Sequence, residues 1–115
     1  MNAGAAEDDD APVQAYYDAI DDGDYDALRE VLADDFTQER PDMVHESPGD
    51  FVAFMRDDRP RDDTRHVLDG VYDGPDGGVA ARGRLVAPEG PMFAFVDVFE
   101  TTPDGRISRL RTYVD

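Results

Sequence analysis

The stretch MFAFVDVFETTPDGRISRLRTYVD, residues 92–115, contains two runs in which apolar side chains alternate with polar or charged ones. Alternation with a period of two is typical of a β-strand that buries one face. TPDG, residues 102–105, lies between the runs and has the proline, aspartate and glycine that favour a tight turn. The stretch therefore predicts an antiparallel hairpin of two strands, residues 92–101 and 106–115.

The chain before this hairpin extends the sheet. RHVLDGVYD (65–73) and VAARGRLV (79–86) also alternate, and GPDG and APEGP have the composition of the turns that join adjacent strands. Because each connection is short, successive strands are expected to pair with one another. Residues 65–115 therefore contain four candidate strands and predict an antiparallel meander of three or more strands.

Upstream of Arg61 the apolar residues recur at helical spacing instead. Proline suits the first turn of a helix, Asp24 and Ser47 are suitable N-caps, and Gly23 is a suitable stop. The expected helices are residues 12–22, 24–32 and 48–59, and a short strand at 36–40 precedes Pro41. The order ααβαββββ predicts an α+β fold in which the helices pack on one face of the sheet.

The turns also fix which residues face each other across the sheet. If TPDG pairs Thr101 with Arg106, then Asp97 lies opposite Leu110. The other two turns give the pairs Ala81–Asp97, Gly83–Phe95, Leu85–Phe93, Leu68–Gly83 and His66–Leu85. The expected helix-covered face then holds His66, Leu68, Tyr72, Ala81, Leu85, Phe93, Phe95, Asp97, Phe99, Leu110 and Thr112. The opposite face holds Ala94, Val96 and Val98 among arginines, a pattern that suits a homodimer.

The composition limits the possible partners. The 115 residues suit one domain, and 28 acidic residues against 11 basic ones, all arginine, give a net charge of −17. This charge repels phosphate backbones and anionic lipids, so we expect no nucleic-acid or membrane partner. Without an apolar leader or a membrane-length run, a cytoplasmic protein is expected. The excess of acidic residues resembles the composition of proteins from extreme halophiles. Residues 1–10 are expected to form an acidic tail, followed by one domain at residues 11–115.

Asp97 is the one carboxylate on the expected inner face. A lone buried carboxylate is costly unless it is paired, hydrogen-bonded or protonated. Two interpretations fit equally well: Asp97 points into a ligand cavity as an acid, base or hydrogen-bond donor, or the Tyr16 hydroxyl or an arginine satisfies it.

Three stretches carry a resemblance to a known family: the run YYDAIDDGDYDALREVLADDF, the ERP that ends the first strand, and the C-terminal VDVFETTPDGRISRLRTYVD. They resemble the nuclear transport factor 2-like superfamily, and within it the branch of SnoaL-like polyketide cyclases and ketosteroid isomerases. The resemblance implies a cone-shaped, curved antiparallel sheet, the cystatin-like fold, wrapped around three N-terminal helices and an apolar pocket. It also implies a small apolar ligand, and we expect no cofactor. In the isomerases a Tyr at Tyr16 and a protonated Asp at Asp97 stabilise an oxyanion. SnoaL-like cyclases use a late-strand Asp as acid/base, for which Asp97 is the nearest match.

Arg40 stands before Pro41, where the isomerases have the aspartate that acts as their base. An arginine cannot remove a proton at ordinary pH. Arg40 either binds a carboxylate or enolate of the ligand, or pairs with Asp97 or Glu39. The residues expected to line a ligand pocket are Phe36, Gln38, Arg40, Phe51, Phe54, Met55, His66, Phe93, Phe95, Leu110 and Thr112.

The two histidines do not have the spacing of a metal site, so none is expected. His66 is expected at the rim of the pocket, with a base as the alternative role, and His45 in a loop. Tyr16 is expected to face the cavity, and Tyr17 or its neighbours are expected to pack on the second or third helix. The predicted function is proton transfer on an apolar carbonyl compound by an isomerase or cyclase, with Asp97 and Tyr16 catalytic. The alternative is a non-catalytic binding or dimerisation module of the same fold.

Overall fold

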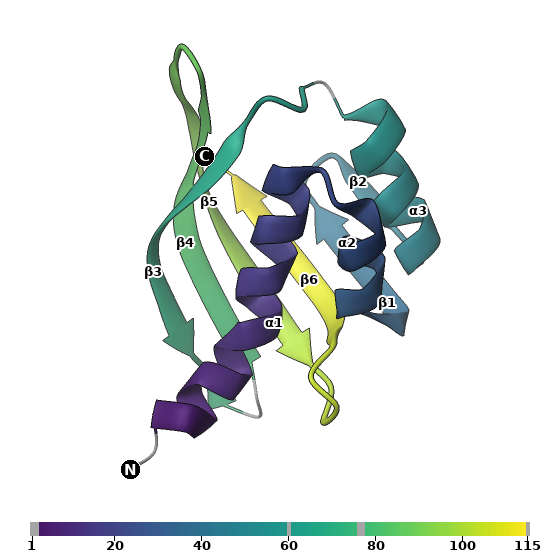
Figure 1. Ribbon diagram of the computed structural model, residues 1–115, viewed down its shortest axis with the longest axis vertical. Helices are drawn as coiled ribbons and strands as arrows, with labels where there is room; N and C mark the ends of the chain where they lie inside the picture. Colours follow the sequence, from purple (N-terminus) through teal and green to yellow (C-terminus); the bar gives the residue numbers. More distant parts are fainter. Residues whose placement is uncertain (1–2, 60, 76–77, 115) are drawn as a thin grey trace.

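The computed structural model describes residues 3–59, 61–75 and 78–114, with side chains from residue 11 onward. A single curved sheet has the strand order β2-β1-β6-β5-β4-β3 (Figure 1). The strands are β1 (Leu32–Arg40), β2 (Met43–His45), β3 (Arg65–Asp73), β4 (Gly78–Ala87), β5 (Gly90–Thr101) and β6 (Ile107–Val114). All neighbours are antiparallel except β1 and β6. The predicted α+β class is confirmed.

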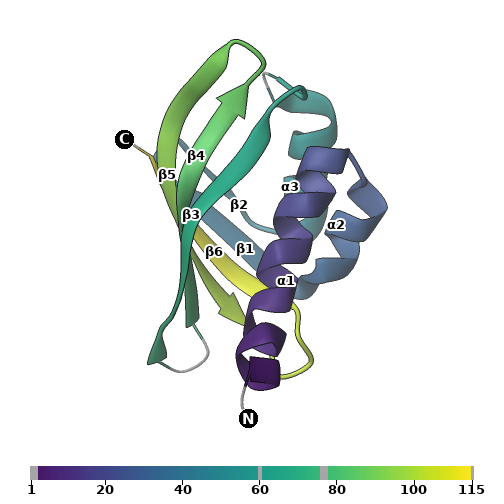
Figure 2. The ribbon, with the colours of Figure 1, turned by 60° about the vertical axis from the view of Figure 1, so that its left-hand side comes forward.

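The helices lie together on the concave face of the sheet (Figure 2). They are α1 (Ala3–Asp22), α2 (Tyr25–Val31) and α3 (Pro48–Ala53), and α3 continues as the π-helical turn η1 (Phe54–Asp58). Helix α1 packs across β3, β4 and β5. None of the described helices is long and apolar enough to cross a membrane.

The predicted helix signals act as expected at two junctions. Gly23 adopts a positive φ of 68° between α1 and α2, a conformation that glycine adopts without strain. The Asp24 side chain accepts a hydrogen bond from the Ala27 N–H at 3.1 Å, and Ser47 accepts one from the Asp50 N–H at 3.1 Å. Both predicted N-caps are therefore confirmed.

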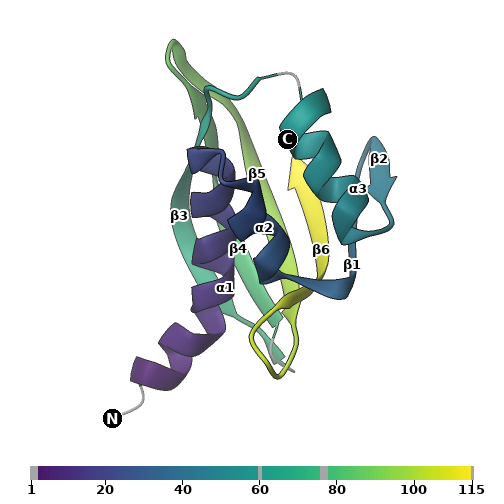
Figure 3. The ribbon, with the colours of Figure 1, turned by 45° about the vertical axis from the view of Figure 1, so that its right-hand side comes forward.

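Two boundaries and one strand differ from the prediction. Helix α1 begins at Ala3, so Pro12 lies inside the helix and not in its first turn. Part of the segment expected as an acidic tail therefore coincides with the first turns of α1. The alanines before Pro12 are strong helix formers, which favours this earlier start. Strand β1 begins at Leu32, a residue expected in the second helix. His45, expected in a loop, ends β2, which pairs with β1 beside α3 (Figure 3). The predicted turn residues Asp76 and Gly77, and Pro60, which follows the predicted third helix, lie outside the described residues.

The register is as predicted for β3–β4 and β4–β5 at all five predicted pairs. It is wrong for the last hairpin, where Asp97 faces Thr112 and not Leu110. The turn closes between Thr102 and Arg106, which shifts the pairing by one residue, and an irregularity between Glu100 and Thr101 shifts it by another. A shift of two residues leaves every side chain on its predicted face.

The prediction that Tyr72 lies on the helix-covered face of the sheet is wrong. Leu68 pairs with Gly83 but Gly70 pairs with Arg82, so Asp69 is an extra residue in β3. Such a bulge reverses the alternation beyond it. Tyr72 therefore lies on the outer face, where its hydroxyl accepts a hydrogen bond from Arg82 at 3.2 Å.

The core fills the space between α1, α2 and the inner face of the sheet. Its buried members include Val13, Tyr17, Ile20, Leu28, Leu32, Phe36, Phe51, Val79, Phe99, Ile107 and Leu110. This core holds one end of the sheet against the helices, and the other end stays open as a pocket.

Candidate functional site

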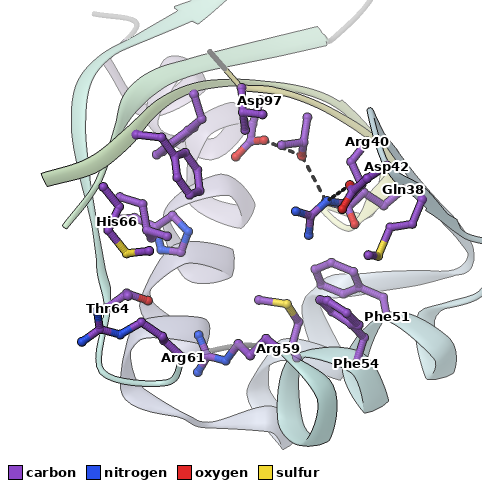
Figure 4. Close-up of a pocket in the computed structure, with 18 of the residues that line it drawn as sticks. Gln38, Arg40, Asp42, Phe51, Phe54, Arg59, Arg61, Thr64, His66 and Asp97 are labelled. Carbon is purple, nitrogen blue, oxygen red and sulfur yellow. Dashed lines mark hydrogen bonds and ion pairs between the residues drawn. The ribbon is translucent and has the colours of Figure 1, made fainter. Parts of the chain in front are cut away.

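A pocket of about 340 Å³ lies between the sheet, α1 and the α3–η1 segment (Figure 4). Its wall contains these residues singled out from the sequence: Tyr16, Gln38, Arg40, Phe51, Phe54, Met55, His66, Phe93, Phe95, Asp97 and Thr112. The sequence did not single out Asp42, Met43, Asp58, Arg59, Arg61, Thr64, Met92 or Val114, which also line it. Four of them lie in loops, Asp42 between β1 and β2 and Arg59, Arg61 and Thr64 between η1 and β3, where strand alternation makes no prediction.

Two residues expected in the pocket do not reach it. Phe36 and Leu110 are fully buried and belong to the core. The Phe36 ring packs on Phe51, with ring centres 5.3 Å apart, and Phe51 has the pocket on its other side. Apolar side chains on an inner face look alike in sequence whether they fill a core or line a cavity.

Asp97 is held by two hydroxyl groups. Tyr17 donates to Oδ2 at 2.5 Å, and Thr112 donates to Oδ1 at 2.6 Å. Gln38 in turn donates to the Thr112 hydroxyl at 3.0 Å. Asp97 is 4% exposed, and burial raises its pKa while the bonds from Thr112 and Tyr17 oppose that rise. The interpretation in which Tyr16 or an arginine satisfies this carboxylate is therefore wrong about the partners, because Tyr17 and Thr112 satisfy it.

The two adjacent tyrosines of α1 divide the roles differently from the prediction. Tyr17, expected to pack on another helix, points to the sheet and reaches Asp97. Tyr16 faces the pocket as expected, and its hydroxyl makes no hydrogen bond to any described residue. Burial and the nearby Asp97 charge raise the pKa of Tyr16, so this phenol keeps its proton and can donate it in a hydrogen bond.

Arg40 pairs with neither Asp97 nor Glu39. Its Nε lies 3.0 Å from Oδ1 of Asp42, and its guanidinium lies 5.9 Å from the centre of the Phe54 ring. Glu39 instead accepts from Arg111 on the outer face at 2.9 Å. Because Arg40 lines the pocket and the single bond to Asp42 uses only Nε, its terminal nitrogens can serve a ligand.

His66 forms a pair with Asp21 that the sequence did not predict. The His66 Nδ1 lies 2.7 Å from Asp21 Oδ1, and the His66 backbone N–H donates to the same carboxylate at 3.0 and 3.2 Å. The imidazole also packs against Tyr17 and Phe95 at ring-centre distances of 4.9 and 5.6 Å. Asp21 and His66 are 45 positions apart, and no local pattern links them.

His45 stands apart from this pair. It is buried against the rings of Phe51 and Phe54 and is not part of the pocket wall. Burial and then the nearby Arg40 charge lower its pKa. Within the described part of the chain, no three His, Asp or Glu side chains gather in the way that a metal ion requires.

The fold and pocket agree with the comparison to known families. The sequence matches the SnoaL-like domain over residues 13–110. The chain belongs to the SnoaL-like domain family. No curated protein matches this SnoaL-like domain.

Solved structures share the fold of this SnoaL-like domain. A candidate ketosteroid isomerase from Kribbella flavida has 21% identity and a TM-score of 0.81, with 95% of this chain and 78% of that chain covered. A candidate isomerase of the SnoaL-like family from Agrobacterium tumefaciens has 23% identity and a TM-score of 0.76, covering 91% and 95%. An LEH-like epoxide hydrolase from M. tuberculosis has 21% identity and a TM-score of 0.75, covering 94% and 83%. These likenesses show the fold, and the named reactions belong to different chemical classes.

Proposed function

We propose that this SnoaL-like domain binds a small apolar carbonyl compound in the pocket and moves a proton on it, as an isomerase or a cyclase does. The observation that supports this most directly is Asp97, a buried carboxyl group in the wall of an open pocket. Aromatic and aliphatic side chains make up much of that wall, so an apolar ligand displaces water from it. In a pocket without water, the electrostatic interaction between a polar side chain and charge that develops on the ligand is stronger than it is in water.

Three polar side chains have separate roles in this proposal. Asp97 exchanges a proton with the substrate, and Tyr16 donates a hydrogen bond to the oxygen that becomes negative. Arg40 holds an acidic or oxygen-rich part of the ligand near the pocket mouth. The hydrogen bonds from Tyr17 and Thr112 fix the carboxyl group in one position and limit the cost of burying it.

The alternative, a binding module without catalysis, rests on the same hydrogen bonds. Both Asp97 oxygens already have partners, as a purely structural carboxylate would. The open pocket argues against a module that only dimerises through the outer face, whereas an enzyme and a ligand-binding module would both use it.

Nuclear magnetic resonance in D₂O tests the proposal with a panel of cyclic ketones, unsaturated ketones and aromatic keto esters. The parent protein is expected to bind members of the panel and to speed exchange of their α-protons for deuterium. Asp97→Asn is expected to bind the same compounds and to lose about 100-fold or more of that rate. Binding with no faster exchange would favour the module, and no binding at all would reject the pocket as a site for carbonyl ligands.

A further inference from the structure

The geometry points to His66, oriented by Asp21, as the general base of this pocket, acting on a carbonyl compound that has an acidic C–H next to its carbonyl group. This inference rests on the proposed function and adds the group that removes the carbon-bound proton. The position before Pro41, where a base would stand in the isomerases that the sequence resembles, holds Arg40. A base has to come from another element.

Asp21 holds the imidazole in one orientation. Its carboxylate accepts from both Nδ1 and the backbone N–H of His66, at 2.7 Å and 3.0 Å for the closest contacts. Strand β3 lies at the edge of the sheet, so this backbone N–H has α1 as its partner. Asp21 lies in the last turn of α1, where the helix dipole disfavours a carboxylate, and the two donors of His66 offset that cost.

This contact sets the tautomer of neutral His66. Because Nδ1 donates its hydrogen to Asp21, Nε2 carries the lone pair that can accept a proton. No described residue forms a hydrogen bond with Nε2, and His66 is part of the pocket wall. The rings of Tyr17 and Phe95 restrict rotation of the imidazole. Nε2 is thus a base in a fixed position beside an apolar cavity.

His66 and Asp97 lie on adjoining parts of the wall (Figure 4). The Tyr17 ring lies between them, packing on the imidazole while its hydroxyl donates to Asp97. In the inferred step Nε2 takes a proton from the carbon next to the carbonyl group. The C–H electron pair forms the enolate double bond, and the carbonyl pair moves to the oxygen, where Tyr16 donates a hydrogen bond. The proton then returns from Nε2 to another atom of the substrate, which restores the neutral imidazole.

The tautomer can be tested without any ligand. The chain contains two histidines, so the imidazole spectrum of protein labelled with nitrogen-15 has two sets of signals, and His45→Asn identifies which set belongs to His66. At about pH 8, above the range over which histidine ordinarily loses its charge, the Nδ1–H form is expected for His66. A dominant Nε2–H form would overturn the inference, because Nε2 could not then accept a proton.

The base can be tested with nitrobenzisoxazole, an apolar probe that needs only proton removal. Loss of its ring C–H proton forms the nitrile, breaks the N–O bond and releases a coloured phenolate, so no other reactant takes part. His66→Asn keeps an amide donor near the place of Nδ1 and removes Nε2. It is expected to lose about 100-fold or more of the rate at an unchanged melting temperature. His45→Asn, which alters the histidine outside the pocket wall, is expected to keep the rate.

Asp21→Asn tests the positioning role. It is expected to lower kcat with little change in KM and to increase the Nε2–H tautomer in the imidazole spectrum, an effect that a merely structural contact would not produce. If His66→Asn keeps the rate while Asp97→Asn loses it, the base is Asp97 and the inference about His66 is wrong, although the proposed function stands. If the parent protein binds the probe and does not speed its elimination, His66 is not a base.

Discussion

The Tyr17 hydroxyl lies 2.5 Å from Oδ2 of Asp97 and joins helix α1 to strand β5 across 80 positions of sequence. The same tyrosine ring packs on His66. One side chain therefore contacts both groups to which proton transfer is assigned. Its neighbour Tyr16 lies 5.0 Å away, ring centre to ring centre, and leaves its own hydroxyl to the pocket.

Tyr17→Phe should destabilise the fold more than Tyr16→Phe. The first change removes a donor from a buried carboxyl group and should cost about 1–3 kcal/mol in the free energy of unfolding. The second removes a hydroxyl that bonds to no described residue, so its effect on stability should be small while ligand affinity falls. Urea unfolding of both variants checks the difference. Equal losses would mean that the Tyr17–Asp97 bond adds no net stability.

Asp97→Asn should change how stability depends on pH. Burial raises the pKa of Asp97 in the folded state above its ordinary value, so the folded protein holds this proton more tightly than the unfolded chain does. The stabilising effect of this proton is complete at pH values below the pKa that Asp97 has in the unfolded chain. It is lost as the pH rises through the pKa that Asp97 has in the folded protein. The unfolding free energy of the parent protein minus that of Asp97→Asn should therefore fall from about pH 4 upward. A difference that rises with pH would show that the hydrogen bonds outweigh burial.

Salt should stabilise the chain. A net charge of −17 on 115 residues causes repulsion in the folded state that dissolved ions screen. The melting midpoint measured by circular dichroism should rise steeply from low to molar salt, as the halophile-like composition predicts. A midpoint that stays constant would argue against that interpretation of the charge.

The outer sheet face should form a homodimer. Val96 and Val98 are each 37% exposed and Tyr113 is 51% exposed, which leaves an apolar strip on the face that carries no helix. Light scattering at high salt should give twice the mass of the chain, and Val96→Glu should give a monomer, because two copies would place these carboxylates in an apolar contact. A parent protein that stays monomeric at micromolar concentration would contradict the prediction.

Much of the fold follows from local patterns. Alternation predicted strands β3 to β6, and the residues around Asp24 and Ser47 predicted two helix starts, because these preferences act over a few residues. Strand β2 was missed since three residues carry too little periodicity. Tyr72 was placed on the wrong face because an extra residue in β3 reverses alternation, and no composition rule located that residue.

The sequence by itself determined the α+β class and the face on which Asp97 lies, because a period of two and turn chemistry are local. The resemblance to the SnoaL-like family added the pocket and many residues of its wall. The tertiary structure decided the partners. The adjacent tyrosines on α1 are both buried. The position of the helix over β5 decides that Tyr17 forms the hydrogen bond to Asp97 and that Tyr16 faces the pocket. The shifted hairpin brought Thr112 to Asp97, and the end of α1 brought Asp21 to His66. Such contacts join residues far apart in sequence, so they depend on the curvature and register of the whole sheet.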